Sequence, residues 1–221
     1  MDKAGYGLIE TMRVREERIP FLDRHLARLG RSLGELGLPK PSQDVPDLVR
    51  PFAATGDAVL RVEVRDGRAS VTVRDLPSLA PPAVITASEP HQPYPHKTTE
   101  RDCFTDAGQE ADVAEADDAL LLAPEGWVAE GTVWTVFWWH GDALYTPALD
   151  LGILPGIGRA RVLELVKRAE QGRYRKQALA GKSLFLANAV RGIVSIASLD
   201  GAPVPADPRS AELAQRFWPT G

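Results

Sequence analysis

The chain lacks several features that would mark a particular class of protein. Its 221 residues include one cysteine, Cys103, which cannot form a disulfide within the chain and fits a reducing compartment. No apolar run approaches the roughly 20 residues of a membrane-spanning helix, and the N-terminal sequence MDKAGYGLIE lacks the apolar segment of a signal peptide. The four histidines and the cysteine show no metal-ligand spacing. We therefore expect a cytoplasmic protein with no membrane anchor and no bound metal.

A strong excess of one charge is also missing. Lysine and arginine number 26 against 30 aspartate and glutamate residues, so the net charge is −4. This balance disfavours nucleic acid or an anionic membrane as a partner. The contents of 44% hydrophobic and 25% charged residues are ordinary for a soluble enzyme, and no internal repeats are visible. A small-molecule substrate is the expected partner.

The first 40 residues have the pattern of strands followed by a helix. Residues 6–14 are expected to form a strand that returns, after a turn, over residues 18–21. Leucines at helical spacing then predict a helix over residues 22–36. Asp23 is a plausible N-cap of this helix, and Gly37 is a plausible stop.

A hairpin and a proline-rich stretch come next. A short helix is expected around residues 47–54, and valines alternate with charged residues on both sides of Asp66-Gly67, which predicts a hairpin with one wet face. Six prolines then disfavour helix and central strand, apart from a short strand at 83–87. We interpret residues 81–96 as a linker between a small N-terminal α/β domain, residues 1–80, and a larger C-terminal domain, residues 97–221.

The larger part alternates strands and helices. The strand expected at 119–123 is apolar without alternation, so both of its faces should be covered. Residues 127–146 have the pattern of strands joined by a tight turn. Further elements are expected as a helix near 101–110, a strand at 183–188, a hairpin-like segment at 192–201 and a helix at 210–218.

One stretch combines two features that suit a phosphorylated ligand. Glu130 lies at the end of a predicted strand, and the glycine-rich loop 151–158 leads into a helix. The first turn of a helix has amide groups without partners, which can bind an anion. A carboxylate and an anion cradle on one unit suit a ligand that is cationic at one end and phosphorylated at the other. Pyridoxal phosphate is such a ligand.

Seven stretches of the chain form an ordered set of motifs. They are GLIETMRV (7–14), DRHLARL (23–29), HKTTER (96–101), AEGTVWTVF (129–137), LYTP (144–147), GILPGIGR (152–159) and LFLANAVRG (184–192). In sequence and in order, this set resembles the fold-type IV pyridoxal-phosphate enzymes, which include branched-chain and D-amino-acid aminotransferases and 4-amino-4-deoxychorismate lyase. The resemblance implies an α/β fold of the α+β type with two domains, like D-amino-acid aminotransferase, and a truncated N-terminal domain.

The resemblance assigns roles around the cofactor, pyridoxal 5'-phosphate. Lys97 would form the Schiff base, which needs an amine that burial or nearby cations can deprotonate. Glu130 would face the pyridine nitrogen and keep it protonated. Arg28 would bind the phosphate together with the backbone amides of Ile157 and Gly158. Taken without the resemblance, Lys97 reads as a solvated surface lysine.

Three positions depart from the family pattern. Ala189 stands where many family aminotransferases carry a hydroxyl that contacts the phosphate, although it still belongs to the cofactor site. Glu100 and Asp102 replace the asparagine and tyrosine expected shortly after the lysine. The cofactor's phenolic oxygen therefore lacks its usual partner in the sequence.

The same resemblance suggests residues for the reaction. Thr11 lies where the lyases place a hydroxyl that protonates the departing enolpyruvyl group, although threonine is also an ordinary strand residue. Arg13 and Arg191 could bind a substrate carboxylate, or could be surface arginines.

The nearest branch of the family is 4-amino-4-deoxychorismate lyase, which forms 4-aminobenzoate and pyruvate for folate synthesis. A class IV aminotransferase acting on branched-chain or D-amino acids with 2-oxoglutarate is the alternative. A non-catalytic remnant of the fold is the third hypothesis. Family members are homodimers, and the five tryptophans would suit a buried interface.

Overall fold

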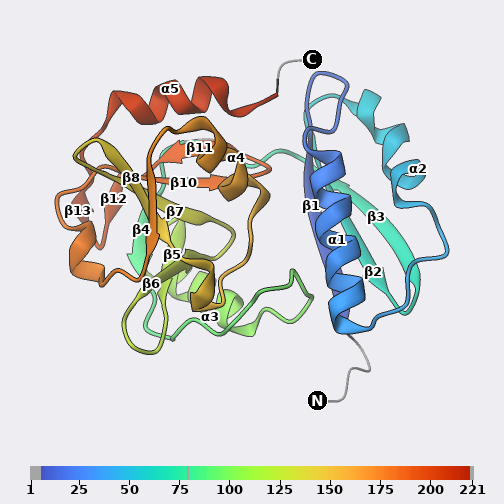
Figure 1. Cartoon of the computed structure of the whole chain (residues 1–221), viewed down its shortest axis with the longest axis horizontal. Coiled ribbons are helices and arrows are strands. Elements are labelled where there is room, and N and C mark those ends of the chain that lie inside the picture. Colours follow the sequence, from blue (N-terminus) through green and yellow to red (C-terminus); the bar gives the residue numbers. More distant parts are fainter. Residues whose placement is uncertain (1–5, 79, 220–221) are drawn as a thin grey trace.

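The computed structural model describes residues 6–78 and 80–219, and its strands form one three-stranded and two five-stranded sheets (Figure 1). The three-stranded sheet is antiparallel in the order β1-β2-β3. Helix α1 lies along this sheet, beside the larger part of the molecule. The elements of this N-terminal part are β1 (Gly7–Val14), α1 (Leu22–Leu36), α2 (Val45–Val49), a 3-10 helix η1 (Arg50–Thr55), β2 (Ala58–Arg65) and β3 (Arg68–Arg74).

The two faces of β1 have different neighbours. Leu8 and Met12 point to the α1 side and pack in one cluster with Leu29 of the helix. Because successive side chains of a strand point to opposite faces, Ile9 and Thr11 face the other way. These two residues line a pocket between the small sheet and the rest of the chain.

The entry to α1 differs from the expectation. The strand expected over residues 18–21 is wrong, since only one isolated bridge, between Arg15 and Arg18, follows the turn. Phe21 rather than Asp23 precedes the helix, in a left-handed conformation with φ 62° and without a side-chain cap. The Phe21 ring packs edge-on against an aromatic ring of the C-terminal helix, a contact that local sequence does not show.

The larger part consists of two sheets and three helices. Its strand orders are β11-β10-β7-β8-β9 and β13-β12-β4-β5-β6. The elements are β4 (Ala83–Thr86), α3 (Asp102–Val113), β5 (Asp118–Leu122), β6 (Val128–Gly131), β7 (Thr135–His140), β8 (Ala143–Pro147), α4 (Ile157–Leu165), β9 (Ala169–Gly172), β10 (Leu184–Asn188), β11 (Gly192–Ser195), β12 (Ser198–Leu199), β13 (Ala202–Pro203) and α5 (Pro208–Phe217), with short 3-10 turns at Leu149–Leu151 and Lys176–Leu179.

Both faces of each large sheet contribute to an apolar cluster. Leu120 of β5 and Trp138 of β7 meet in a cluster shared by the two sheets. Leu121 packs on the other side with residues of α3, while Phe137 packs with residues of α4 and α5. The strand expected to be covered on both faces is therefore β5, and this prediction is confirmed.

Two segments are placed differently from their sequence pattern. The hairpin-like segment 192–201 is not a hairpin, because β11 pairs with β10 while β12 pairs with β4 and β13. The chain changes sheets between the two strands. Strand β4 lies inside the range 81–96 that we interpret as a linker, and it pairs in parallel with β5, so residues 83–86 are part of a sheet. The division into domains 1–80 and 97–221 and the truncation of the first stay predictions.

No helix in the described ranges is both long enough and apolar enough to cross a membrane.

Candidate active site

Lys97 lies where the segment before α3 is joined to β1. The Ile9 amide donates to the Lys97 carbonyl at 2.7 Å, and Leu8 and Thr98 form an isolated antiparallel bridge. These bonds fix the backbone while the side chain lines the pocket. Within the described residues no hydrogen-bond or ion-pair partner is recorded for the Lys97 amine. Burial, reinforced by the charges of Arg101 and Arg28, lowers its pKa to about 7.

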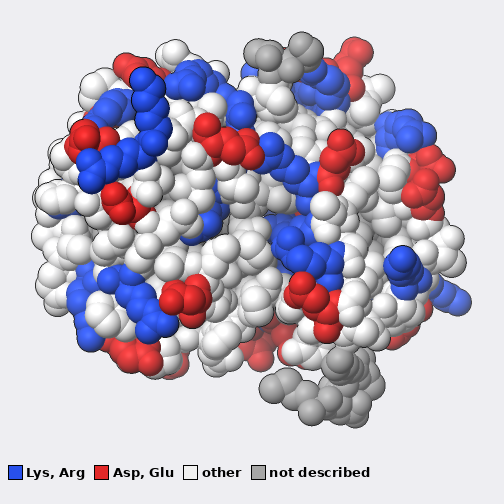
Figure 2. Space-filling model, viewed as in Figure 1, with Lys and Arg blue, Asp and Glu red and all other residues white. Residues whose placement is uncertain are grey.

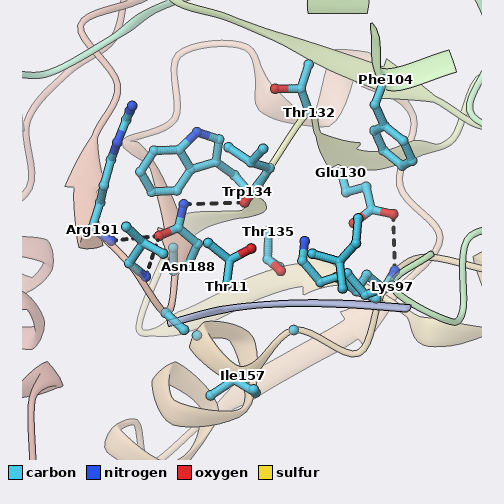
Figure 3. A pocket seen from close by; sticks show the side chains of 18 of the residues that line it. Thr11, Lys97, Phe104, Glu130, Thr132, Trp134, Thr135, Ile157, Asn188 and Arg191 are labelled. Carbon is cyan, nitrogen blue, oxygen red and sulfur yellow. Dashed lines mark hydrogen bonds between the residues drawn. The ribbon is translucent and has the colours of Figure 1, made fainter. Parts of the chain in front are cut away.

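Glu130 on β6 offers a carboxylate to the same pocket (Figure 3). Its side chain is buried, and its Oε1 atom is 2.9 Å from His91 Nε2 and accepts a hydrogen bond from the Leu154 amide at 3.1 Å. The second oxygen has no recorded partner in the described part of the chain. His91, which the sequence reading passed over in the proline-rich stretch, therefore fixes the orientation of this carboxylate.

The start of α4 forms an uncapped cradle. Ile157 and Gly158, which open the helix, line the pocket, and no side chain caps the helix. A Cβ on Gly158 would lie 2.6 Å from the Cα of Asn188, so only glycine lets the helix approach β10 this closely. Free amides in this position suit an anion such as a phosphate group.

We expect Gly158→Ala to weaken binding of pyridoxal phosphate. The added methyl group must push α4 away from the Asn188 backbone, and overpacking of this kind costs about 1–3 kcal/mol, equivalent to up to about two decades in affinity. Cofactor titration and melting temperature measure the effect. Gly108→Ala on α3 is the matched control, because a Cβ there meets nothing within 4 Å. Equal cofactor affinity in the two variants would contradict the cradle.

Arg28 lines the pocket, but each of its three side-chain nitrogens already has a partner. Its Nε and Nη2 atoms donate to Glu10 at 2.8 and 2.6 Å, and its Nη1 atom donates to the Pro155 carbonyl at 3.4 Å. Burial acts to raise the pKa of Glu10, and the charge and hydrogen bonds of Arg28 outweigh it, so that the pKa falls to about 2. Arg28 therefore presents mainly its Nη1 edge to an anion. We did not expect Glu10 to take part, although its position in β1 interrupts the apolar face toward α1.

His25 completes this buried network. Its Nδ1 atom is 2.6 Å from Glu10, while its Nε2 atom is buried without a partner in the described chain, and the residue lines the pocket. Burial lowers the pKa of His25. Because the His25 Nε2 atom is buried without a partner in the described residues, a polar group of a ligand bound in the pocket would form a favourable hydrogen bond with it.

The structure brings Thr11 and Arg191 to the pocket as well (Figure 3). Ala189 also lines it. The Arg191 guanidinium lies over the Trp134 ring, 5.2 Å from its centroid, and has no recorded hydrogen-bond partner in the described residues. Ala189 has no hydroxyl group, but Thr135, which also lines the pocket, has one. The Thr135 hydroxyl lies beside Gly156, since its Oγ1 atom would be 3.1 Å from a Cβ added to that glycine.

Arg13 does not reach the pocket. It is buried, forms an ion pair with Asp57 at 2.8 Å and lies over the ring of Trp218. Arg61 of β2, which is paired with Thr11 across the strands, lines the pocket instead, and so does Arg74 of β3. The structure thus replaces one expected carboxylate-binding candidate by two others.

The pocket is strongly basic in a chain that is acidic overall. Six basic residues line it against one acid, Glu130. On the molecular surface, basic side chains gather along the junction between the N-terminal part and the larger part (Figure 2). The basic residues of the lining are Arg28, Arg61, Arg74, Lys97, Arg101 and Arg191. Such an excess suits a ligand or ligand pair with several negative charges.

The fold and the pocket define a class of protein: an α/β protein in which a lysine amine of lowered pKa, a buried carboxylate and an uncapped helix start line one pocket. The model of the amino-transferase class IV family matches residues 7–199, so the chain belongs to this family.

The proteins similar to this chain include lyases and aminotransferases. An aminodeoxychorismate lyase from Bacillus subtilis is 34% identical over 88 residues, which are 38% of this chain and 30% of that protein. A solved structure from Mesorhizobium loti, provisionally assigned as an amino-acid aminotransferase, is 32% identical and covers 87% of this chain and 99% of its own, with a TM-score of 0.80. A structure assigned provisionally as 4-amino-4-deoxychorismate lyase, from Legionella pneumophila, has a TM-score of 0.84 at 22% identity over 96% of this chain and 91% of its own, which shows the same fold. The alignment with the Bacillus protein spans less than a third of that protein's length.

Proposed function

We propose that this chain is a pyridoxal-phosphate lyase that converts 4-amino-4-deoxychorismate to 4-aminobenzoate and pyruvate. The observation that carries the proposal is the basic rim of the pocket. The α4 amides and Arg28 would bind the phosphate of the cofactor. Three further arginines, Arg61, Arg74 and Arg191, line the same pocket. The lyase substrate has two carboxylates, which guanidinium groups can bind; the Arg191 guanidinium has no hydrogen-bond partner among the described residues, and Arg61 is 3.4 Å from Glu63.

The residues fit the cofactor. The uncapped start of α4 and the Nη1 edge of Arg28 would offer donors to the phosphate, and the His25 Nε2 atom, whose ring proton is on Nδ1 toward Glu10, would accept a hydrogen bond from water around it. Glu130, whose carboxylate is held by His91, would face the pyridine nitrogen, and Lys97 would supply the amine for covalent attachment. When bound, the cofactor accepts electron density from the carbon that loses its proton.

Lys97 and Thr11 divide the proton transfers. With its pKa lowered to about 7, the Lys97 amine can take a proton from the amine-bearing carbon near neutral pH. The ring C–O bond then breaks, the ring becomes aromatic, and the enolpyruvyl group leaves with its bonding electrons. The Thr11 hydroxyl, facing the pocket from β1, donates a proton to this leaving group, which becomes pyruvate.

The arginine rim gives the proposal a direct test. Purified protein with cofactor is incubated with 4-amino-4-deoxychorismate, and separately with branched-chain or D-amino acids plus 2-oxoglutarate. We expect pyruvate and 4-aminobenzoate in equal amounts from the first, and little glutamate from the second. Arg61→Gln and Arg191→Gln should raise KM for the lyase substrate by about one to two decades, because a charged hydrogen bond contributes about 1.5–3 kcal/mol. Arg50→Gln is the control, on an exposed arginine paired with Asp47.

An aminotransferase is the second candidate, favoured by the likeness to the Mesorhizobium loti protein. Glutamate formation without pyruvate release would select it and would reject the lyase. The homodimer implied by the family stays a prediction for either reaction.

A further inference from the structure

Arg101, just before α3, is a fixed cation without an acidic partner. Its Nη2 atom donates to the Thr132 carbonyl at 2.6 Å, and its Nη1 atom donates to the Tyr94 hydroxyl at 3.3 Å. Its guanidinium lies over the Phe104 ring, 4.8 Å from the centroid. Within the described chain it forms no ion pair, although it lines the pocket. An arginine held on three sides but left without a carboxylate is suited to meet the charge of a ligand.

The charge of Arg101 affects the Lys97 amine. After burial, the charge of Arg101 has the largest effect in lowering the pKa of Lys97. Both residues line the same pocket, so Arg101 faces the space in which the cofactor would be joined to Lys97. Tyr94 is less able to serve as a donor there, because its hydroxyl already donates to the Thr98 carbonyl at 2.6 Å, and burial raises its pKa.

The ring hydroxyl of the cofactor determines which kind of protein group is favourable beside Lys97. Pyridoxal phosphate carries its ring hydroxyl on the carbon next to the one that bears the aldehyde, so the ring oxygen stays close to Lys97 after attachment. This oxygen is most useful as an anion, and an adjacent cation stabilises it. The two positions at which the family pattern has other residues, Glu100 and Asp102, are exposed and do not line the pocket.

We propose that Arg101, positioned by Tyr94, Phe104 and Thr132, holds the ring oxygen of the cofactor as an anion in this protein. The inference rests on cofactor binding in the proposed function, and it holds for a lyase and an aminotransferase alike. It assigns to a guanidinium the contact for which the sequence offers no tyrosine at the usual place.

The test is a pH titration of the visible absorption of the lysine-bound cofactor in the intact holoenzyme. A cation beside the ring oxygen favours loss of the proton shared with the neighbouring nitrogen, so it lowers the midpoint. Arg101→Gln should therefore raise the midpoint by about 1–3 pH units, the range typical of a charge within a few ångströms. Arg74→Gln, which removes the same charge from an exposed position of the pocket rim, should leave it within about 0.3 units because solvent screens that charge.

Tyr94→Phe gives a second measurement. It removes the hydroxyl that holds Arg101 and should raise the midpoint in the same direction by a smaller amount, which keeps the test available if Arg101→Gln does not fold. A midpoint unchanged in both variants, or an equal rise in Arg74→Gln, would overturn the inference. A wild type that never acquires visible absorption would instead reject cofactor binding, so the two failures are distinguishable.

Discussion

Lys97→Ala is expected to produce a folded protein that lacks the visible absorption of the lysine-bound cofactor, which the wild type shows with pyridoxal phosphate. The Lys97 amine makes no hydrogen bond with the described residues, and its burial near two arginines is unfavourable. Removing the side chain should therefore change the free energy of unfolding by less than about 1 kcal/mol. Activity should fall to background, because covalent attachment and proton transfer both use this amine. Absorbance, melting temperature and turnover on one preparation measure all three effects.

The control for this variant is Lys40→Ala, because Lys40 is exposed and does not line the pocket. It should bind cofactor and turn over like the wild type. A wild type that remains colourless with added cofactor would favour the third hypothesis, a non-catalytic remnant of the fold.

The lowered pKa of Lys97 also predicts how attachment depends on pH. Only the neutral amine attacks the cofactor aldehyde, and the fraction in this form increases as pH rises through the pKa. The attachment rate of cofactor-free protein should therefore rise through about pH 7 and level off above it. A rate still rising steeply toward the ordinary lysine pKa would mean that the pocket does not lower the pKa.

Glu130→Gln is expected to keep the fold and the bound cofactor but to slow turnover about 10²–10³-fold, or 2.7–4 kcal/mol. A glutamine of the same size can still accept the Leu154 amide bond, so packing hardly changes. The negative charge facing the pyridine nitrogen is lost, and with it most of the capacity of the ring to accept electrons.

The control is Glu125→Gln, the same change on an exposed turn glutamate. Absorbance, melting temperature and turnover should all stay near wild type in this variant. Turnover of Glu130→Gln within a few-fold of wild type would show that Glu130 does not face the ring nitrogen.

The sequence by itself determined the features that depend on local order. The leucine spacing of α1, the turn at Asp66-Gly67 and the glycines before α4 each specify their own element, because helix period, turn chemistry and backbone freedom are local properties. The ordered set of motifs was also enough to indicate the family and to select Lys97 and Glu130, both of which line one pocket.

Only the tertiary structure decided which side chains line the pocket and which partners they have. Arg13 and Arg61 both belong to strands of the small sheet, and each has an acidic neighbour, Asp57 at 2.8 Å and Glu63 at 3.4 Å. Only Arg61 lines the pocket. Glu10 and His91 become partners of Arg28 and Glu130 across 18 and 39 residues, distances at which no local pattern reports a contact. The same limit explains why 192–201 has the local pattern of a hairpin yet joins two sheets: hydrogen-bond partners of a strand edge are chosen by the packing of the whole chain.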